Sequence, residues 1–144
     1  MSKYKQHIIP SVTTPKEWQR MSQSELRKVV YQFIKCNLAG KVIKNEDTGI
    51  NVQITVNAGR KTAYGEAMYL KKASVVQIIP QVIRYAKYNN FGAKKSTDAK
   101  NILGYLNYKC KCMIDGKTEC LRLAIRLQND GKFYYNIEIN KITS

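Results

Sequence analysis

Two hairpin signals near the end of the chain constrain its fold more than any other feature. Asp115-Gly116 and Asn129-Asp130-Gly131 each interrupt a run in which apolar and polar residues alternate. A two-residue Asp-Gly loop favours a type I′ turn, and a three-residue loop that ends in glycine favours a bulged turn. The two loops therefore predict three consecutive antiparallel strands whose apolar positions share one face, and this register pairs Cys110 with Leu121.

The opposite face of these strands is predicted to be open to water. It carries cations, hydroxyls and aromatic rings: Tyr105, Asn107, Lys109, Lys111, then Cys120, Arg122, Ala124, Arg126, then Tyr134, Asn136, Glu138 and Asn140. The register places Arg126 between Tyr105 and Tyr134. Because arginine can hold a phosphate while tyrosine rings stack on bases, this face suits a nucleic acid. The alternative is a solvated sheet face whose cross-strand pairs only stabilise the strands.

The charge balance favours the first interpretation. Lys and Arg number 25 against 10 Asp and Glu, which gives a formal net charge of +15 and a pI near 9.8. Such an excess attracts acidic partners through counterion release and electrostatic steering, and nucleic acid is the first candidate. A basic protein without such a partner is the simpler alternative.

The upstream sequence predicts helices and short strands. In order, we expect a flexible basic arm over 1–13, a short helical turn at Thr14-Pro15-Lys16-Glu17, a helix over 22–38, strands over 41–44 and 50–56, a helix over 73–88, and a polar loop over 93–101. Ser22 and Glu25 have the spacing of a capping box, whereas Pro80 must kink or split the second helix. The order helix, two strands, helix, three strands predicts one α+β domain over 14–144, with the helices packed on one face of an antiparallel sheet.

A second candidate site is the loop Gly59-Arg60-Lys61-Thr62, followed by Lys71. A glycine-containing loop with cations and a hydroxyl can bind phosphate through backbone amides and side chains. The spacing differs from that of a P-loop, and an ordinary basic loop is the simpler interpretation.

The cysteines predict neither a metal site nor a disulfide framework. Cys110 and Cys112 point to the apolar face, Cys120 points to the other, and His7, the one histidine, lies in the arm. Four-ligand zinc binding needs convergent ligands, so we expect no metal and no cofactor. The sequence also offers no apolar run of membrane-span or signal-peptide length, which predicts a cytoplasmic protein with no membrane association.

Acid–base hydrolysis commonly uses histidine or paired carboxylates, and neither is available in the predicted sheet. An enzyme acting on RNA would therefore use the ribose 2′-hydroxyl as nucleophile, with cations stabilising the charged transition state. The candidate catalytic residues are Lys61, Arg122, Arg126 and Tyr134, with Lys61 or Tyr134 transferring the proton. The candidate nucleic-acid-binding residues are Arg60, Thr62, Lys71, Tyr105, Lys109, Lys111 and Asn136.

Several short motifs resemble a known family. They are Asp115-Gly116-Lys117, Leu121-x-Leu123, Asp130-Gly131-Lys132-Phe133-Tyr134-Tyr135-x-x-Glu138-Ile139, Thr48-Gly49-Ile50-x-Val52 and Gly59-x-Lys61-Thr62. Over roughly residues 22–142 the chain resembles phage MuF-type C-terminal domains, also described as a large polyvalent protein-associated domain. That group is placed with the barnase–EndoU–colicin–RelE-like nucleases, which have N-terminal helices followed by a curved antiparallel sheet.

The resemblance implies a metal-independent RNase of toxin or phage origin, with the substrate on the open sheet face, in a bacterial cell and encoded by a phage or prophage. Whether the chain is an enzyme stays open. One alternative is a non-catalytic phage accessory protein that binds nucleic acid or a nucleotide signal. Another is a basic interaction domain with an acidic partner, such as an immunity or inhibitor protein.

Overall fold

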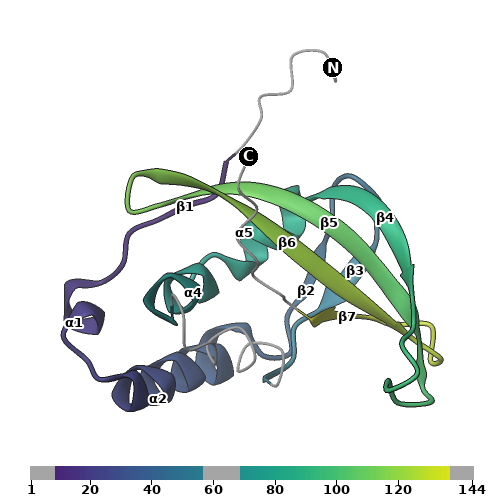
Figure 1. Cartoon of the computed structure of the whole chain (residues 1–144), viewed down its shortest axis with the longest axis horizontal. Coiled ribbons are helices and arrows are strands. Elements are labelled where there is room, and N and C mark those ends of the chain that lie inside the picture. The colour runs from purple at the N-terminus through teal and green to yellow at the C-terminus, as the bar shows by residue number, and fades with distance from the viewer. Residues whose placement is uncertain (1–8, 57–68, 137–144) are drawn as a thin grey trace.

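The fold combines helices with a strongly curled, open sheet (Figure 1). The structure, a computed structural model, describes residues 9–56 and 69–136. Its elements are β1 (Ser11–Val12), α1 (Lys16–Gln19), α2 (Gln23–Phe33), the π-helical turn η2 (Ile34–Leu38), β2 (Val42–Lys44), β3 (Asn51–Gln53), α4 (Tyr69–Val76), α5 (Ile79–Tyr85), β4 (Lys87–Ala93), β5 (Ile102–Ile114), β6 (Lys117–Gln128) and β7 (Phe133–Asn136).

The strand order in the sheet is β1-β5-β6-β7-β3-β2, with β4 also alongside β5. The sequence predicts an antiparallel sheet, and this is wrong at two places because β1 pairs with β5, and β3 with β7, in parallel. Each parallel pair spans only two residue pairs. These short pairings join segments far apart in the chain, so no local turn signal could have revealed them.

The two hairpins adopt the predicted register. Cys110 pairs with Leu121, and β7 follows β6 through the loop that contains Gly131. Asp115 and Gly116 both have positive φ, 52° and 80°, as a type I′ turn requires, and Gly131 has φ 79°. Glycine occupies two of these three positions because it adopts positive φ without a steric penalty. The sequence signal for the hairpins is therefore confirmed.

The first long helix also forms where the capping box predicts it. The Ser22 side chain accepts from the Glu25 backbone N–H, and the Glu25 carboxylate accepts from the Ser22 backbone N–H, both at 3.1 Å. The helix continues through η2 to Leu38, and its buried side chains include Leu26 and Val30. Packing of this apolar stripe against the rest of the core stabilises the helix more than propensity alone.

The helix predicted over 73–88 is divided in two, begins earlier, at Tyr69, and ends earlier, at Tyr85. α4 ends at Val76 and α5 begins at Ile79, with Pro80 in the first turn of α5. Proline costs little there, because N–H groups in the first turn have no partner within the helix. Pro80 thus splits the helix instead of kinking it.

The chain after Tyr85 departs further from the expected order. Residues 87–93, expected to end the helix and start a polar loop, form β4 and pair antiparallel with β5. β1 is a further strand, at the end of the segment predicted as an arm. Without β4, the long strand β5 would leave unpaired backbone groups along one edge, and β4 supplies their partners. The order helix, two strands, helix, three strands is therefore incomplete.

The core lies between the helices and the inner side of the sheet. α4 and α5 lie beneath the curl of β5 and β6, and α2 lies beyond α4 (Figure 1). One hydrophobic cluster includes Val30 from α2, Val82 from α5, Leu123 from β6 and Tyr135 from β7, all at most 2% exposed. Apolar burial of this extent is the main favourable term in folding, and it fixes which side of β5, β6 and β7 remains available to a ligand.

Candidate nucleic-acid interface

The outer side of β5, β6 and β7 places Arg126 directly between two tyrosines. Arg126 pairs with Tyr105 on β5 and with Tyr134 on β7, and Arg122 pairs with Lys109. Directly opposite residues have their Cβ atoms about 5 Å apart, so these side chains lie within contact range of one another. We call this surface the outer face and define it by the residues Tyr105, Lys109, Lys111, Arg122, Arg126 and Tyr134.

The alternation of each strand explains why these side chains are on the surface. Arg122, Lys109 and Lys111 are exposed, and Arg126 is partly exposed. Their sequence neighbours point inward and are buried: Tyr108, Cys110, Cys112, Leu121, Leu123 and Ile125. Because successive side chains of a strand point to opposite sides, a slip of one residue would bury every cation of this face. The buried neighbours therefore hold the cations outside.

Both tyrosines of the outer face interact with aspartates. The Tyr134 hydroxyl donates to Asp130 Oδ2 at 2.7 Å. The pKa of Asp98 is held below its usual value mainly by the Lys95 backbone N–H, with a smaller contribution from the Tyr105 hydroxyl. Each ring is thus tied at its outer end to a turn, which restricts its motion before any ligand binds.

The hydrogen bond to Asp130 also sets the chemistry available to Tyr134. It is the first of the causes that raise the pKa of this phenol above its ordinary value of 10.0. The pKa of Asp130 is lowered, first by the Lys132 backbone N–H at 2.8 Å and then by the Tyr134 hydroxyl. Tyr134 is therefore neutral near pH 7, which suits a hydrogen-bond or proton donor and disfavours a general base.

The Gln128 amide lies beside the Arg126 guanidinium. When its oxygen is turned toward Arg126, it accepts from Nε and Nη2 at 3.0 and 3.1 Å. A neutral amide orients the guanidinium without cancelling its charge, and the remaining donors of Arg126 stay available for a phosphate.

One of the predicted nucleic-acid-binding residues, Lys71, does not lie on the outer face. Lys71 lies on α4 and its Nζ is 2.8 Å from Glu119 Oε1, whose side chain is 8% exposed. Glu119 pairs with Cys112, on the inner side of the sheet. The structure therefore separates Lys71 from the outer face and pairs its charge with a nearly buried carboxylate.

The other candidate residues lie outside the described part of the structure, wholly or in part. Arg60, Lys61 and Thr62 fall in the segment 57–68, and Glu138 follows the last described residue. Asn136 pairs with Ala124, in the register of the outer face, but its side chain lies outside the described part. The predicted loop site and its proton-transfer residue Lys61 thus stay predictions.

The buried thiols of Cys110 and Cys112 behave as apolar groups. Burial raises the pKa of Cys110 to about 12 and that of Cys112 to about 11. Thiols with such pKa values remain protonated and are poor metal ligands and nucleophiles. Within residues 9–56 and 69–136, no three His, Cys, Asp or Glu side chains lie close enough together to hold a metal ion.

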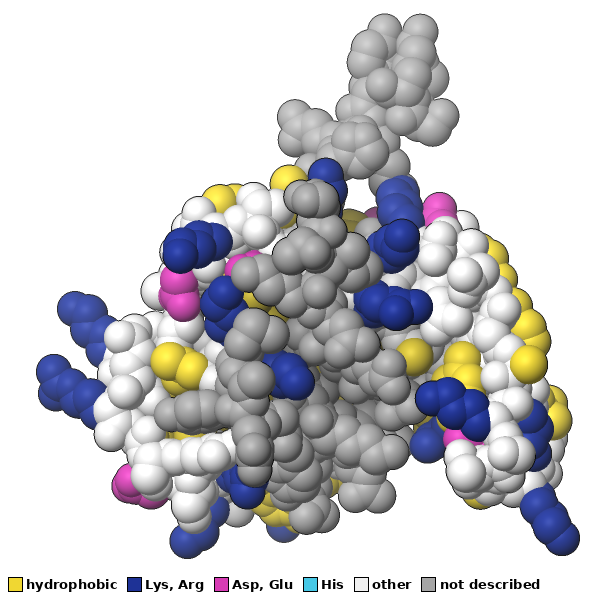
Figure 2. Space-filling view, in the orientation of Figure 1, with side chains coloured by type: hydrophobic (Ala, Val, Ile, Leu, Met, Phe, Trp, Pro, Cys, Tyr) yellow, Lys and Arg dark blue, Asp and Glu magenta, His cyan; other side chains and the backbone are white. Residues whose placement is uncertain are grey.

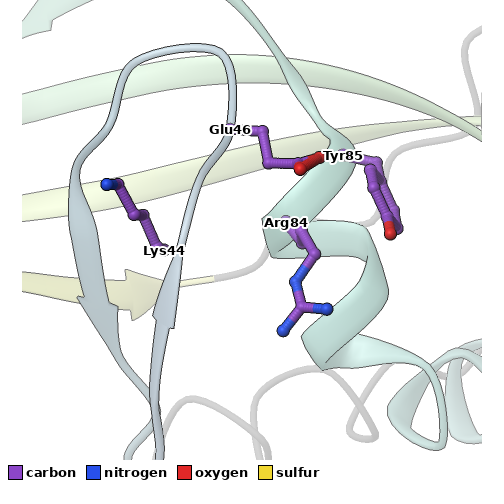
Figure 3. A pocket seen from close by; sticks show the side chains of 4 residues that line it. All are labelled: Lys44, Glu46, Arg84 and Tyr85. Carbon is purple, nitrogen blue, oxygen red and sulfur yellow. The ribbon is translucent and has the colours of Figure 1, made fainter. Parts of the chain in front are cut away.

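A pocket that sequence reasoning missed lies between the β2–β3 turn and α5. It has a volume of about 440 Å³ and is lined by Lys44, Glu46, Arg84 and Tyr85 (Figure 3). Buried Asn45 fixes its shape, because the Asn45 Nδ2 donates to two carbonyls at the end of α5. These contacts join distant segments, so no motif marks the pocket. Its lining mixes two cations with a carboxylate and does not favour one ligand.

Positive charge is spread over the molecule and is not confined to the outer face. Figure 2 shows Lys and Arg side chains around the visible surface, with fewer Asp and Glu among them. This distribution supports attraction of polyanions at long range, while local geometry must supply any specificity. None of the helices in the described residues has the length and apolar character needed to cross a bilayer.

Comparison with known proteins identifies the family. No curated protein and no solved structure matches the chain. The model of one family, large polyvalent protein-associated domain 3, matches residues 21–135, from the start of the first long helix into β7. This match covers the outer face and every helix and strand from α2 into β7, and it leaves out β1 and α1. The chain therefore belongs to the large polyvalent protein-associated domain 3 family.

Proposed function

We propose that the outer face binds single-stranded nucleic acid, with RNA as the first candidate. The observation that carries the proposal is the position of Arg126 between Tyr105 and Tyr134 on an open sheet surface. Sheet surfaces that present aromatic rings beside cations bind single strands, because bases stack on the rings and phosphates meet the cations. Every base has a flat face, so such a surface accepts many sequences.

The second cationic pair extends this surface along the strands. Arg122 and Lys109 lie opposite each other, four residues from Arg126 and Tyr105 respectively. Four residues of an antiparallel strand span about 14 Å, so the two positions can contact well-separated phosphates of one strand of nucleic acid. Stacking by a tyrosine contributes about 1–3 kcal/mol per base in comparable proteins.

Ribonuclease activity on the same face is the second candidate. The neutral Tyr134 hydroxyl favours only a mechanism in which Tyr134 acts as the proton donor. With its raised pKa, Tyr134 would donate a proton to the leaving 5′-oxygen while the ribose 2′-hydroxyl attacks the phosphate. Arg126 would stabilise the charge that develops on the phosphate. A base that accepts the 2′-hydroxyl proton must come from elsewhere, and Lys61 is the candidate.

Membership of a family associated with large polyvalent proteins supports an accessory role in a phage-type protein. Within that role, the outer face would bring the nucleic acid to the other parts of such a protein. A basic interaction domain with an acidic inhibitor or immunity protein would use the same cations. It would give no role to the two tyrosine rings, and for this reason we prefer nucleic acid.

The proposal is tested by binding of a fluorescently labelled single-stranded RNA of about twelve nucleotides, a length within the span of one such surface. The test variant is Arg122→Gln/Arg126→Gln. The matched control is Arg20→Gln/Arg84→Gln, which removes the same charge from two exposed arginines on α5 and at the end of α1.

We expect Arg122→Gln/Arg126→Gln to lower the affinity for RNA by at least about tenfold, and Arg20→Gln/Arg84→Gln to lower it by about twofold or less. Equal losses in the two variants would show that only net charge matters, and the outer face would not be the site. The same samples, kept in EDTA and resolved on a gel, report cleavage. Strand scission by the wild type that disappears in Tyr134→Phe would support the ribonuclease.

A further inference from the structure

Within the described residues, β4 is an edge strand of the sheet, and Asp47 caps the start of this edge by accepting from the Tyr88 N–H. It spans seven residues and pairs with β5, and no other strand in the described residues pairs with it. Its first five residues, 87–91, are all exposed. β2, an edge strand at the other end of the sheet, has only three residues. A long edge strand offers a row of backbone donors and acceptors to another chain.

The hydrogen bond of Tyr88 shows which backbone groups face this edge. The Tyr88 N–H donates to Asp47 Oδ2 at 2.9 Å, so it points away from β5. Residues of an antiparallel pair alternate between bonding to the neighbour and facing away from it. A register shift between Tyr88 and Asn90 adds one residue to β4. Tyr88 and Phe91 therefore pair with Tyr108 and Leu106, which are two positions apart on β5. The N–H and C=O of Phe91 therefore also face the open edge.

Large apolar side chains accompany this edge. Phe91 is 55% exposed, Leu103 51% and Tyr88 41%. The Phe91 ring lies against Gly104, where an added Cβ would come 2.3 Å from Phe91 Cζ. Since Phe91 and Leu106 share the inner side of the sheet, the Phe91 ring lies on the side opposite the outer face.

The surroundings of β4 are basic. Lys87 begins the strand, and Lys94, Lys95 and Lys100 follow it in the loop before β5. The Asp98 carboxylate in this loop already accepts from the Lys95 backbone N–H at 2.7 Å. A second copy of a chain with net charge +15 would be repelled at such an edge, whereas an acidic segment would be attracted.

We propose that the β4 edge binds an extended, acidic segment of a protein partner as an additional strand. Backbone hydrogen bonds would supply affinity, and alternate apolar side chains of the segment would pack beside Tyr88 and Phe91. The intervening acidic side chains would then lie on the side of Lys87, which pairs with Lys109 of the outer face and whose Nζ lies 4.0 Å from Asp47 Oδ1. Nucleic acid cannot continue the backbone ladder, which is why the open edge favours a peptide.

The probe is a synthetic ten-residue peptide of alternating Glu and Val, compared with one of alternating Lys and Val. Binding is followed by calorimetry and by hydrogen exchange of backbone amides. We expect the Glu/Val peptide to bind more tightly by at least about tenfold and to slow exchange of the Phe91 amide. Phe91→Glu should weaken binding of this peptide about tenfold or more, because it adds like charge and removes the ring.

Val42→Glu is the matched control, since Val42 is 54% exposed and lies on β2, the other edge strand. It should change affinity by less than about twofold. Lys94→Glu/Lys95→Glu gives a second test, because it should weaken the Glu/Val peptide and strengthen the Lys/Val peptide. Equal binding of the two peptides, an equal loss of affinity in Val42→Glu and Phe91→Glu, or self-association of the free protein through β4 would each overturn the proposal.

Discussion

Thr14→Val tests a polar clamp that ties the start of the domain to the β5–β6 turn. Thr14 is 2% exposed. Its N–H donates to Asp115 Oδ1 at 2.7 Å and its hydroxyl donates to Asp115 Oδ2 at 2.6 Å. Its hydroxyl also lies 2.6 Å from Ser74 Oγ, on α4. One threonine thus joins three segments that are distant in the chain.

The expected loss follows from the bond that valine cannot make. Valine keeps the shape of threonine and removes the hydroxyl donor. A hydrogen bond to a charged group contributes about 1.5–3 kcal/mol, and the exposure of Asp115 reduces this to about 1–2 kcal/mol. For a chain of this length, that loss lowers the Tm by about 3–7 °C.

The same bond predicts a dependence on pH. Hydrogen bonds from the Thr14 side chain and backbone hold the pKa of Asp115 below its ordinary value of 3.8. A carboxylate whose folded pKa is lowered stabilises the protein above its unfolded pKa, and this contribution is lost as pH falls through the folded pKa. The stability difference between wild type and Thr14→Val should therefore be full at pH 7 and shrink below 3.8.

Urea unfolding at pH 7 and in a series of acidic buffers measures this difference. Thr13→Val is the control, because Thr13 is the adjacent, exposed threonine. It should change the free energy of unfolding by less than about 0.5 kcal/mol. An effect of Thr13→Val equal to that of Thr14→Val, or a Thr14→Val effect that does not change with pH, would refute the role assigned to Asp115.

Three further predictions concern a buried asparagine, a tightly packed glycine and the cysteine thiols. Asn45→Ala should lower the free energy of unfolding by about 2–4 kcal/mol in a urea titration, because it removes both amide donors to α5 and the acceptor for the following turn. A loss no larger than that caused by replacing an exposed asparagine with alanine would contradict this. Gly104→Ala should cost about 1–3 kcal/mol, since its Cβ must displace the Phe91 ring, and unchanged stability would show that the ring moves freely. At pH 8 a thiol reagent should label exposed Cys36 and leave Cys110 and Cys112 unmodified until the protein unfolds, as checked by peptide mass spectrometry; rapid labelling of the native buried thiols would contradict their raised pKa values.

The hairpins could be predicted because their signals are local. Asp115-Gly116 specifies a turn, and the alternation on each side fixes the register without reference to the rest of the chain. The same logic placed Arg126 beside Tyr105 and Tyr134. Ser22 and Glu25 likewise set the start of the first long helix.

The missed features depend on contacts between distant segments. β4 contains asparagines and a glycine that favour turns, yet it becomes a strand because β5 offers a long edge to pair with. Thr14 has the position of a helix cap, but its side chain is engaged by Asp115 and Ser74, and Pro15 stands at the cap instead.

Within the candidate site, the sequence identified the polar and cationic residues but not the carboxylates that interact with them. Lys71 resembled a free phosphate ligand, and only the fold shows that Glu119 pairs with it. The hydrogen bond from Tyr134 to Asp130 crosses four residues around the Gly131 turn, and the alternation of the strand gave no sign of it. Such pairings decide which groups are available for chemistry, and they require the tertiary structure.

The most direct test of the outer face is the salt dependence of single-stranded RNA binding. Each phosphate contact contributes about 0.7 to the slope of log affinity against log salt concentration. Arg122→Gln/Arg126→Gln should therefore reduce the slope by about 1.4 relative to wild type, while Arg20→Gln/Arg84→Gln leaves it nearly unchanged. An unchanged slope in the outer-face variant, or an equal reduction in both, would contradict the account.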